Sequence, residues 1–261
     1  MPMNQSVLLK EEAGGVLTLR LNRPAKRNAL NGALVEALES AMEDARERED
    51  VRVVLLRGEG PDFCAGADLA ELASMLEASR EESLADARRL GALLLAMRGH
   101  PKPILAGVHG RALAGGCGLA TACDLILARE DAELGYPEVH LGFVPAMVMA
   151  ILRKKISEGQ AFDLVATGRR LSAGEAHDLG LVSRVLPADE FQEGVAAFAR
   201  DLANRPPSAM TLIKGLLYQQ ADLTVPEGVE RGAQVNAEAR MTEACREGVR
   251  TFLARKGSGQ P

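Results

Sequence analysis

Short apolar runs alternate with longer segments of mixed polarity along much of the chain. Residues 6–12 and 15–22 form the first two runs, and Ala13, Gly14 and Gly15 between them predict the tight turn of a β-hairpin. Residues 51–58, 102–110 and 125–129 are rich in Val, Leu and Ile and predict buried strands. A run at 181–187 is the last strand that the pattern indicates.

Apolar residues at helical spacing occupy the segments between these runs. Asn31 can cap a helix over 32–47. One face of that helix would carry Leu34, Leu38, Ala41, Met42 and Ala45. Residues 69–98, rich in alanine, leucine and charge, have the same spacing, and a further helix is expected near 145–156.

The repeated order of strand, glycine loop and helix predicts an α/β fold built from strand-strand-helix or strand-helix units. Beyond residue 187 the strand signals fade, and residues 189–256 have a helical pattern interrupted at 205–207 and 224–228. We therefore divide the chain into a core over 1–195 and a C-terminal helical subdomain over 196–261.

The composition argues against several classes of function. A net charge of −5, a pI near 5.6, two tyrosines and six phenylalanines make nucleic acid a poor partner. No apolar run reaches the roughly 18 residues of a membrane-spanning helix, and the first residues lack the features of a signal peptide. The four cysteines form no CxxC pair. We therefore expect a soluble, cytoplasmic protein with neither a nucleic-acid nor a membrane partner.

Two glycine-rich loops, 63–69 and 110–119, each follow a predicted strand and open a predicted helix. Glycine lets a backbone approach a ligand closely, and the first N–H groups of a helix have no partner within that helix. Two such loops that meet would bind an oxygen atom on which negative charge develops. One loop alone is explained more simply by tight packing of a helix on a strand, so this hypothesis depends on both loops.

Other glycine and metal motifs do not fit this sequence. Cys117 follows Gly115 and Gly116 where a phosphate-binding loop needs a lysine, and Thr121 stands where a dinucleotide-binding fingerprint needs a glycine. Neither GxSxG nor HExxH occurs. We expect no metal site, because ligand spacing is absent among the four histidines, which are His100, His109, His140 and His177.

Four segments have an order and spacing that resemble a known family: LNRPAKRNAL, FCAGADL, KPILAGVHGRALAGGCGLATACDLILA and PEVHLGFVP. Over about residues 6–256 the chain resembles the crotonase (enoyl-CoA hydratase/isomerase) superfamily. The resemblance implies a spiral of ββα units, a C-terminal helical subdomain used in subunit contacts, and a homotrimer or homohexamer. It also implies a lyase or isomerase of fatty acid metabolism that acts on acyl-CoA, with no cofactor besides the coenzyme A of its substrate.

The resemblance assigns roles to individual residues. The N–H groups of Ala67 and Gly115 match the oxyanion hole that binds the thioester oxygen, and residues 65–69 match the segment that hydrogen-bonds adenine through its backbone. The residues that the resemblance assigns to CoA binding are Lys26, Arg27, Ala65, Gly66, Asp68, Leu69, Phe252 and Lys256. Phe252 and Lys256 belong to a stretch that sometimes comes from a neighbouring subunit.

Hydratases of this family use two glutamates, and the chain matches only one of the two positions. Glu138 is present, whereas the other position is Gly118. One glutamate can move a proton between Cα and Cγ, which is double-bond isomerisation, and loss of the other would weaken hydration by about 10²–10⁴. Glu71 and Glu77 are candidates for a substitute acid and His140 for an acid or base, although an exposed position without a catalytic role fits each of them better.

Three functions therefore stay open. The leading hypothesis is an enzyme of the enoyl-CoA hydratase/isomerase type, in which Ala67 and Gly115 stabilise a thioester enolate and Glu138 transfers protons. The second is a CoA-binding protein without turnover, which the glycine at position 118 motivates. The third is thioester hydrolysis or decarboxylation at the same oxyanion hole. The pattern does not identify the acyl group.

Overall fold

The computed structural model describes residues 6–257, without the side chain of Lys256. Its larger sheet has the strand order β1-β2-β3-β4-β6-β9, in which β1 and β2 are antiparallel and the others parallel. The predicted hairpin is confirmed, because Gly14 and Gly15 join β1 to β2 with φ angles of 59° and 79°. The six strands are β1 (Leu8–Ala13), β2 (Val16–Leu21), β3 (Val53–Gly58), β4 (Ile104–Val108), β6 (Leu125–Arg129) and β9 (Arg184–Leu186).

After β4 and again after β6, the chain enters a second sheet of three short strands in the order β5-β7-β8. The order β4, β5 and then α4 (Gly115–Ala122) forms a strand-strand-helix unit and confirms the predicted α/β class. Strands of three residues are too short to show an alternating pattern, so the sequence did not predict them. They are β5 (Arg111–Leu113), β7 (Glu133–Gly135) and β8 (Arg170–Ser172).

Side-chain caps begin three of the helices on one side of the larger sheet. α1 (Gly32–Glu47) has the predicted bounds, and the Asn31 side chain accepts a hydrogen bond from the Leu34 N–H at 3.1 Å. The helical spacing over 69–98 belongs to two helices, because a capping box between Ser79 and Glu82 starts a new helix. The segment therefore contains α2 (Leu69–Ser74) and α3 (Arg80–Arg98), and the helix expected near 145–156 is the shorter α5 (Ala146–Leu152).

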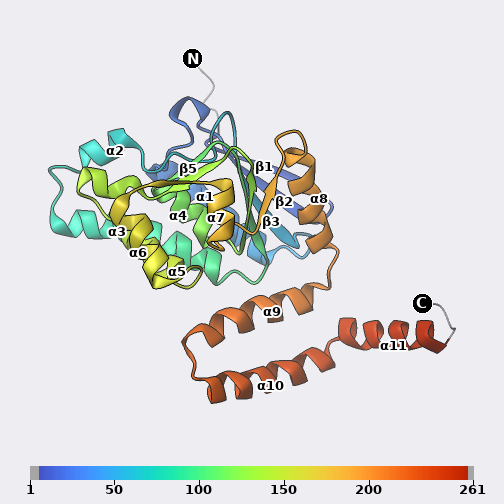
Figure 1. Cartoon of the computed structure of the whole chain (residues 1–261). Helices are drawn as coiled ribbons and strands as arrows, with labels where there is room; N and C mark the ends of the chain where they lie inside the picture. The colour runs from blue at the N-terminus through green and yellow to red at the C-terminus, as the bar shows by residue number, and fades with distance from the viewer. Residues whose placement is uncertain (1–5, 258–261) are drawn as a thin grey trace.

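Both faces of the larger sheet are covered by helices (Figure 1). In β3, Val54 and Leu56 face a core shared with α1 and α3, whereas the alternate residues Val53 and Leu55 face α8 (Phe191–Ala203). Every fourth residue of α8 from Phe191 to Ala203 is buried against that second face. The division expected near residue 195 thus falls inside α8, and the helices that leave the sheet begin after it.

Three C-terminal helices extend away from the layered core in Figure 1. They are α9 (Pro207–Gln219), α10 (Val225–Met241) and α11 (Glu243–Gly257). None of the helices between residues 6 and 257 combines the length and the apolar character needed to cross a membrane. The remaining elements are α6 (Glu158–Thr167), α7 (Ala173–Asp178), and the 3₁₀ helices η1 (Pro24–Lys26), η2 (Pro137–Leu141) and η3 (Gln220–Asp222).

A polar cluster around Asp124 attaches α9 to the core. The Lys214 ammonium lies 2.9 Å from the Asp124 carboxylate, and the Lys214 side chain is only 7% exposed. The Tyr218 hydroxyl also donates to Asp124, and the backbone N–H of Ile104 donates to it at 2.6 Å. The Arg98 guanidinium lies over the Tyr218 ring at 3.4 Å. One carboxylate at the start of β6 therefore connects a central strand, α3 and α9.

We expect Asp124→Asn to lower the free energy of unfolding by about 3 kcal/mol, because the buried Lys214 charge would lose its counter-charge. Asp201→Asn is the matched control, since Asp201 pairs with Arg205 on the surface, where such a pair contributes about 0.5 kcal/mol or less. Urea unfolding of both variants measures the difference. Equal losses would contradict a special role for the Asp124 cluster.

Candidate active site

In the first glycine loop, the N–H group of Ala67 points away from the segment around Leu30, which pairs with this loop. The Leu30 N–H donates to the Gly66 carbonyl at 2.7 Å, and the Asp68 N–H donates to the Leu30 carbonyl at 2.8 Å. This is the pattern of a parallel bridge between Leu30 and Ala67. Because successive N–H groups of an extended segment alternate in direction, the Ala67 N–H points to the opposite side.

The second loop presents the N–H group of Gly115 at the start of α4. The first N–H groups of a helix have no acceptor within it, which leaves this group available for a ligand. Ala114 before it has φ 49° and ψ −127°, a conformation that costs a residue with a side chain on the order of 1–3 kcal/mol. A hydrogen bond of 2.9 Å from the Ala114 N–H to the Gly135 carbonyl holds this turn in place.

The two loops lie against each other. A Cβ atom built on Gly115 would lie 3.9 Å from the Ala67 nitrogen, and one built on Gly66 would lie 3.8 Å from the Gly115 nitrogen. The approach needs glycine, because a Cβ atom on Gly116 would lie 2.2 Å from the carbonyl oxygen of Cys64. The structure thus brings together the two N–H groups that the sequence singled out, in an arrangement suited to one shared oxygen acceptor.

Ala67 and Gly115 both line a cavity of about 220 Å³ among α2, α3, α4 and α5, which lie on one side of the sheet in Figure 1. Among the described residues that line it, Glu138 alone has a polar side chain. The lining is Ala65, Ala67, Leu69, Leu72, Leu90, Leu94, Ala114, Gly115, Gly118, Pro137, Glu138, Leu141, Phe143, Val144, Pro145, Ala146, Met147 and Val148.

Glu138 lies in η2, which begins with Pro137, and only 9% of the residue is exposed. Within residues 6–257, its buried Oε2 atom has no hydrogen-bond partner. Burial raises the pKa of the Glu138 carboxyl above its ordinary value of 4.5. A carboxyl with a raised pKa beside a pair of free N–H groups has the properties of a general acid/base.

The loop that carries Lys26 and Arg27 lies beside the first glycine loop, because the Ala65 N–H donates to the Arg27 carbonyl at 3.0 Å. Both side chains are exposed, and the Arg27 guanidinium lies 3.8 Å from the Asp62 carboxylate. The Asp68 carboxylate is instead occupied: it lies 2.7 Å from the Arg23 guanidinium and caps the first residues of α2. No local sequence pattern marks Arg23, which contacts a partner 45 residues further along the chain.

Several other candidates lie away from the cavity. Phe252 and Lys256 are in α11, which contacts α9 and α10, and the Lys256 side chain lies outside the described part of the chain. The Glu71 carboxylate accepts a hydrogen bond of 2.9 Å from the Gly32 N–H, and Glu77 is exposed. His140 lies on η2 beside α6, and neither it nor the two glutamates line the cavity.

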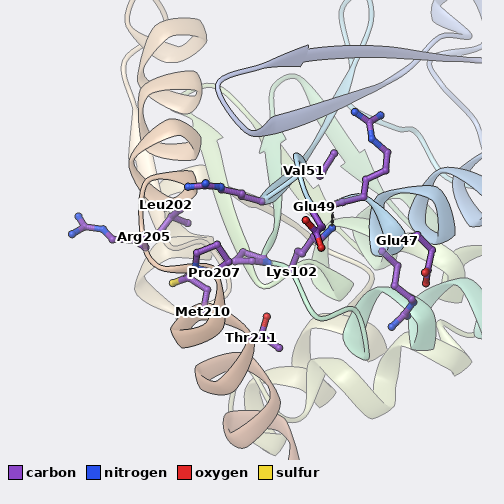
Figure 2. Close-up of a pocket in the computed structure, with 13 residues that line it drawn as sticks. Glu47, Glu49, Val51, Lys102, Leu202, Arg205, Pro207, Met210 and Thr211 are labelled. Carbon is purple, nitrogen blue, oxygen red and sulfur yellow. Dashed lines mark hydrogen bonds between the residues drawn. The ribbon is translucent and has the colours of Figure 1, made fainter. Parts of the chain in front are cut away.

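A larger cavity of about 380 Å³ lies elsewhere, where the end of α1 and the starts of β3 and β4 meet the α8–α9 junction (Figure 2). Its cations are already engaged: Lys102 donates to the carbonyls of Ala45 and Arg48, and Arg52 donates to the Ala203 carbonyl at 3.3 Å. These interactions join α1 and β3 to neighbouring segments, so this cavity is explained by structural contacts. We therefore place the candidate active site in the smaller, apolar cavity.

Comparisons with known proteins agree on one family. A family model described as enoyl-CoA hydratase/isomerase matches residues 11–258. A Thermus thermophilus protein whose name assigns it to the enoyl-CoA hydratases is 39% identical, covering 95% of this chain and 98% of that protein. The 2,3-dehydroadipyl-CoA hydratase of Escherichia coli is 36% identical, covering 96% and 97%. The crystal structure of an enoyl-CoA hydratase from Mycobacterium smegmatis has a TM-score of 0.91 at 34% identity, covering 95% and 96%.

Two glycines of α4 provide a matched test of the contact between the loops. We expect Gly116→Ala to destabilise the protein by about 1–3 kcal/mol, because the added methyl group would collide with the Cys64 carbonyl. Gly118→Ala meets only ordinary contacts, beginning at 3.5 Å, and removes a helical glycine, so we expect it to be neutral or to stabilise by about 0.5–1 kcal/mol. Urea unfolding compares them, and equal effects would show that the close approach is unimportant.

Proposed function

Because the chain belongs to the enoyl-CoA hydratase/isomerase family, we propose that it is an enzyme of acyl-CoA thioesters in which Glu138 is the single acid/base. The observation that carries this proposal is a buried carboxyl whose Oε2 atom has no hydrogen-bond partner within residues 6–257, in a cavity where the other described lining residues have no polar side chain. The N–H groups of Ala67 and Gly115 open onto the same cavity. This combination supports proton transfer on an acyl group whose oxygen is held by two donors.

The proposed reaction moves a double bond from the 3-enoyl to the 2-enoyl position. The thioester oxygen accepts hydrogen bonds from Ala67 and Gly115, which stabilise the negative charge that forms on it. The ionised Glu138 takes a proton from Cα, and the electrons of that bond form a dienolate with the charge on oxygen. The protonated Glu138 then returns its proton to Cγ, the carbonyl re-forms, and the enzyme is restored without a second acid.

The lining favours isomerisation over hydration. Hydration needs a water molecule at Cβ, and a buried water is held by about two to four polar groups. Besides Glu138, the lining side chains offer none. The same lack of polar partners disfavours thioester hydrolysis, which also needs a positioned water. The retained Glu138 beside the donor pair favours turnover over binding alone.

Binding of the CoA portion is proposed at the rim next to residues 65–69. Lys26 and Arg27 are exposed there and offer positive charge to phosphate groups. Leu69 is 72% exposed and also lines the cavity, so it stands at the mouth. Phe252 and Lys256 fit this account only if α11 of a neighbouring subunit supplies them.

A homotrimer or homohexamer is proposed for the assembled protein. The helices α9, α10 and α11 leave the core and carry large apolar side chains that are exposed in the single chain. A single subunit gains nothing from this exposure, whereas packing against other copies would bury it. The exposed residues include Ile213, Leu217, Val225, Val229, Met241, Val249 and Leu253.

We expect Glu138→Gln to lower the rate of isomerisation of a 3-enoyl-CoA by about 10²–10⁴, because the amide cannot take or return the proton. The KM should change little, since the donors at Ala67 and Gly115 remain. Steady-state assays of isomerisation and of crotonyl-CoA hydration measure both activities. Rapid hydration by the wild-type protein that Glu138→Gln leaves unchanged would overturn the one-base mechanism.

The pH dependence of kcat/KM offers a second measurement. Glu138 must be ionised to take the first proton, and burial raises its pKa above 4.5. The rate should therefore fall as pH decreases, about tenfold per unit below a midpoint that lies above 4.5. A midpoint at or below the value of an ordinary glutamate would show that a different group is the base.

A further inference from the structure

Gly118 of α4 faces Val148 of α5 across the wall of the cavity. A Cβ atom built on Gly118 would lie 3.5 Å, 3.7 Å and 3.8 Å from Cβ, Cγ2 and Cγ1 of Val148, and these are its three nearest neighbours. Both residues are buried, and Val148 is only 5% exposed. A side chain at position 118 would therefore begin in van der Waals contact with the isopropyl group of Val148.

This wall lies next to the acyl group of a substrate held by the oxyanion donors. Gly118 is three residues after Gly115, so the two share one face of α4. This wall offers no free hydrogen-bonding group at Gly118 and no polar side chain on α5. The Gly118 N–H donates to the Ala114 carbonyl at 2.9 Å, and Ala146, Met147 and Val148 carry no polar side-chain atom that could hold a water.

We infer that Val148 determines the reaction outcome by excluding water, and any second carboxylate, from the α4 side of the bound acyl group. Water addition would require a base to remove a proton from water as its oxygen bonds to Cβ, and an acid to supply a proton to Cα. If no water lies at the wall formed by Gly118 and Val148, the protonated Glu138 can transfer its proton only to a carbon atom of the substrate. This inference rests on the proposed function, in which Glu138 is the acid/base.

Val148 differs from the other apolar residues of the cavity in its position. Phe143 and Val144 are 56% and 59% exposed and stand at the mouth, where they do not close the interior. Leu94 of α3 is 3% exposed and lines the cavity, but none of its atoms is among the three nearest to a Cβ at position 118. Leu94 therefore serves as a matched control for the removal of buried apolar volume.

The test measures the ratio of crotonyl-CoA hydration to 3-enoyl-CoA isomerisation in wild type, Gly118→Glu, Gly118→Glu/Val148→Ala and Gly118→Glu/Leu94→Ala. We expect Gly118→Glu alone to leave the ratio near that of wild type, because Val148 blocks the new carboxylate. The double variant with Val148→Ala should raise the ratio at least about tenfold, by making room for a second acid and a water. The double variant with Leu94→Ala should not.

An isosteric variant keeps the inference testable if the glutamate variants fail to fold. Val148→Thr preserves the volume and adds one hydroxyl group that can hold a water, so it should raise the ratio by about three- to tenfold. The inference is overturned if Gly118→Glu alone equals the Val148→Ala double variant, if Leu94→Ala is as effective, or if Val148→Thr leaves the ratio unchanged. Absence of isomerisation in the wild type would instead overturn the proposed function, whatever the ratio does.

Discussion

The geometry of the site depends on the close backbone contact between Gly116 and the carbonyl of Cys64. β3 and β4 are parallel neighbours, so the loops that follow them leave the same edge of the sheet. That topology brings the loops near each other, but only the missing Cβ at Gly116 lets α4 lie directly against the first loop. The N–H groups of Ala67 and Gly115 thereby become neighbours without any contribution from side-chain chemistry.

Sequence reasoning succeeded where the structure is decided locally. The hairpin depends on Gly14 and Gly15, and α1 depends on Asn31 and its apolar periodicity, so both elements could be predicted, and α1 with its bounds. It failed for elements whose formation depends on contacts with other segments of the chain. The three-residue strands β5, β7 and β8 exist because they pair with one another, and the break at Ser79 is a side-chain cap within a region of uniform helical pattern. The burial of Lys214 likewise depends on a carboxylate 90 residues earlier.

The same distinction applies to the candidate site. Family resemblance identified Ala67, Gly115 and Glu138, and the structure places all three on one cavity. It did not indicate that Asp68 would be occupied by Arg23, or that Val148 would face Gly118. Those relationships join segments that lie 45 and 30 residues apart, and no local pattern encodes them. The glycine at position 118 can be read from the sequence, but what fills the space beside it cannot.

The electrostatics of the cavity provide a reason why one carboxylate and an apolar wall occur together. Burial already disfavours the ionised form of Glu138 and raises its pKa, and none of the described residues that line the cavity is a cation that could offset that cost. A second carboxylate nearby would repel the first, since two like charges about 4 Å apart at an effective dielectric of 20 interact by about 4 kcal/mol. With Val148 against Gly118, Glu138 ionises without such a competitor. In the proposed mechanism, the apolar wall therefore lets a single buried carboxyl act first as the base and then as the acid.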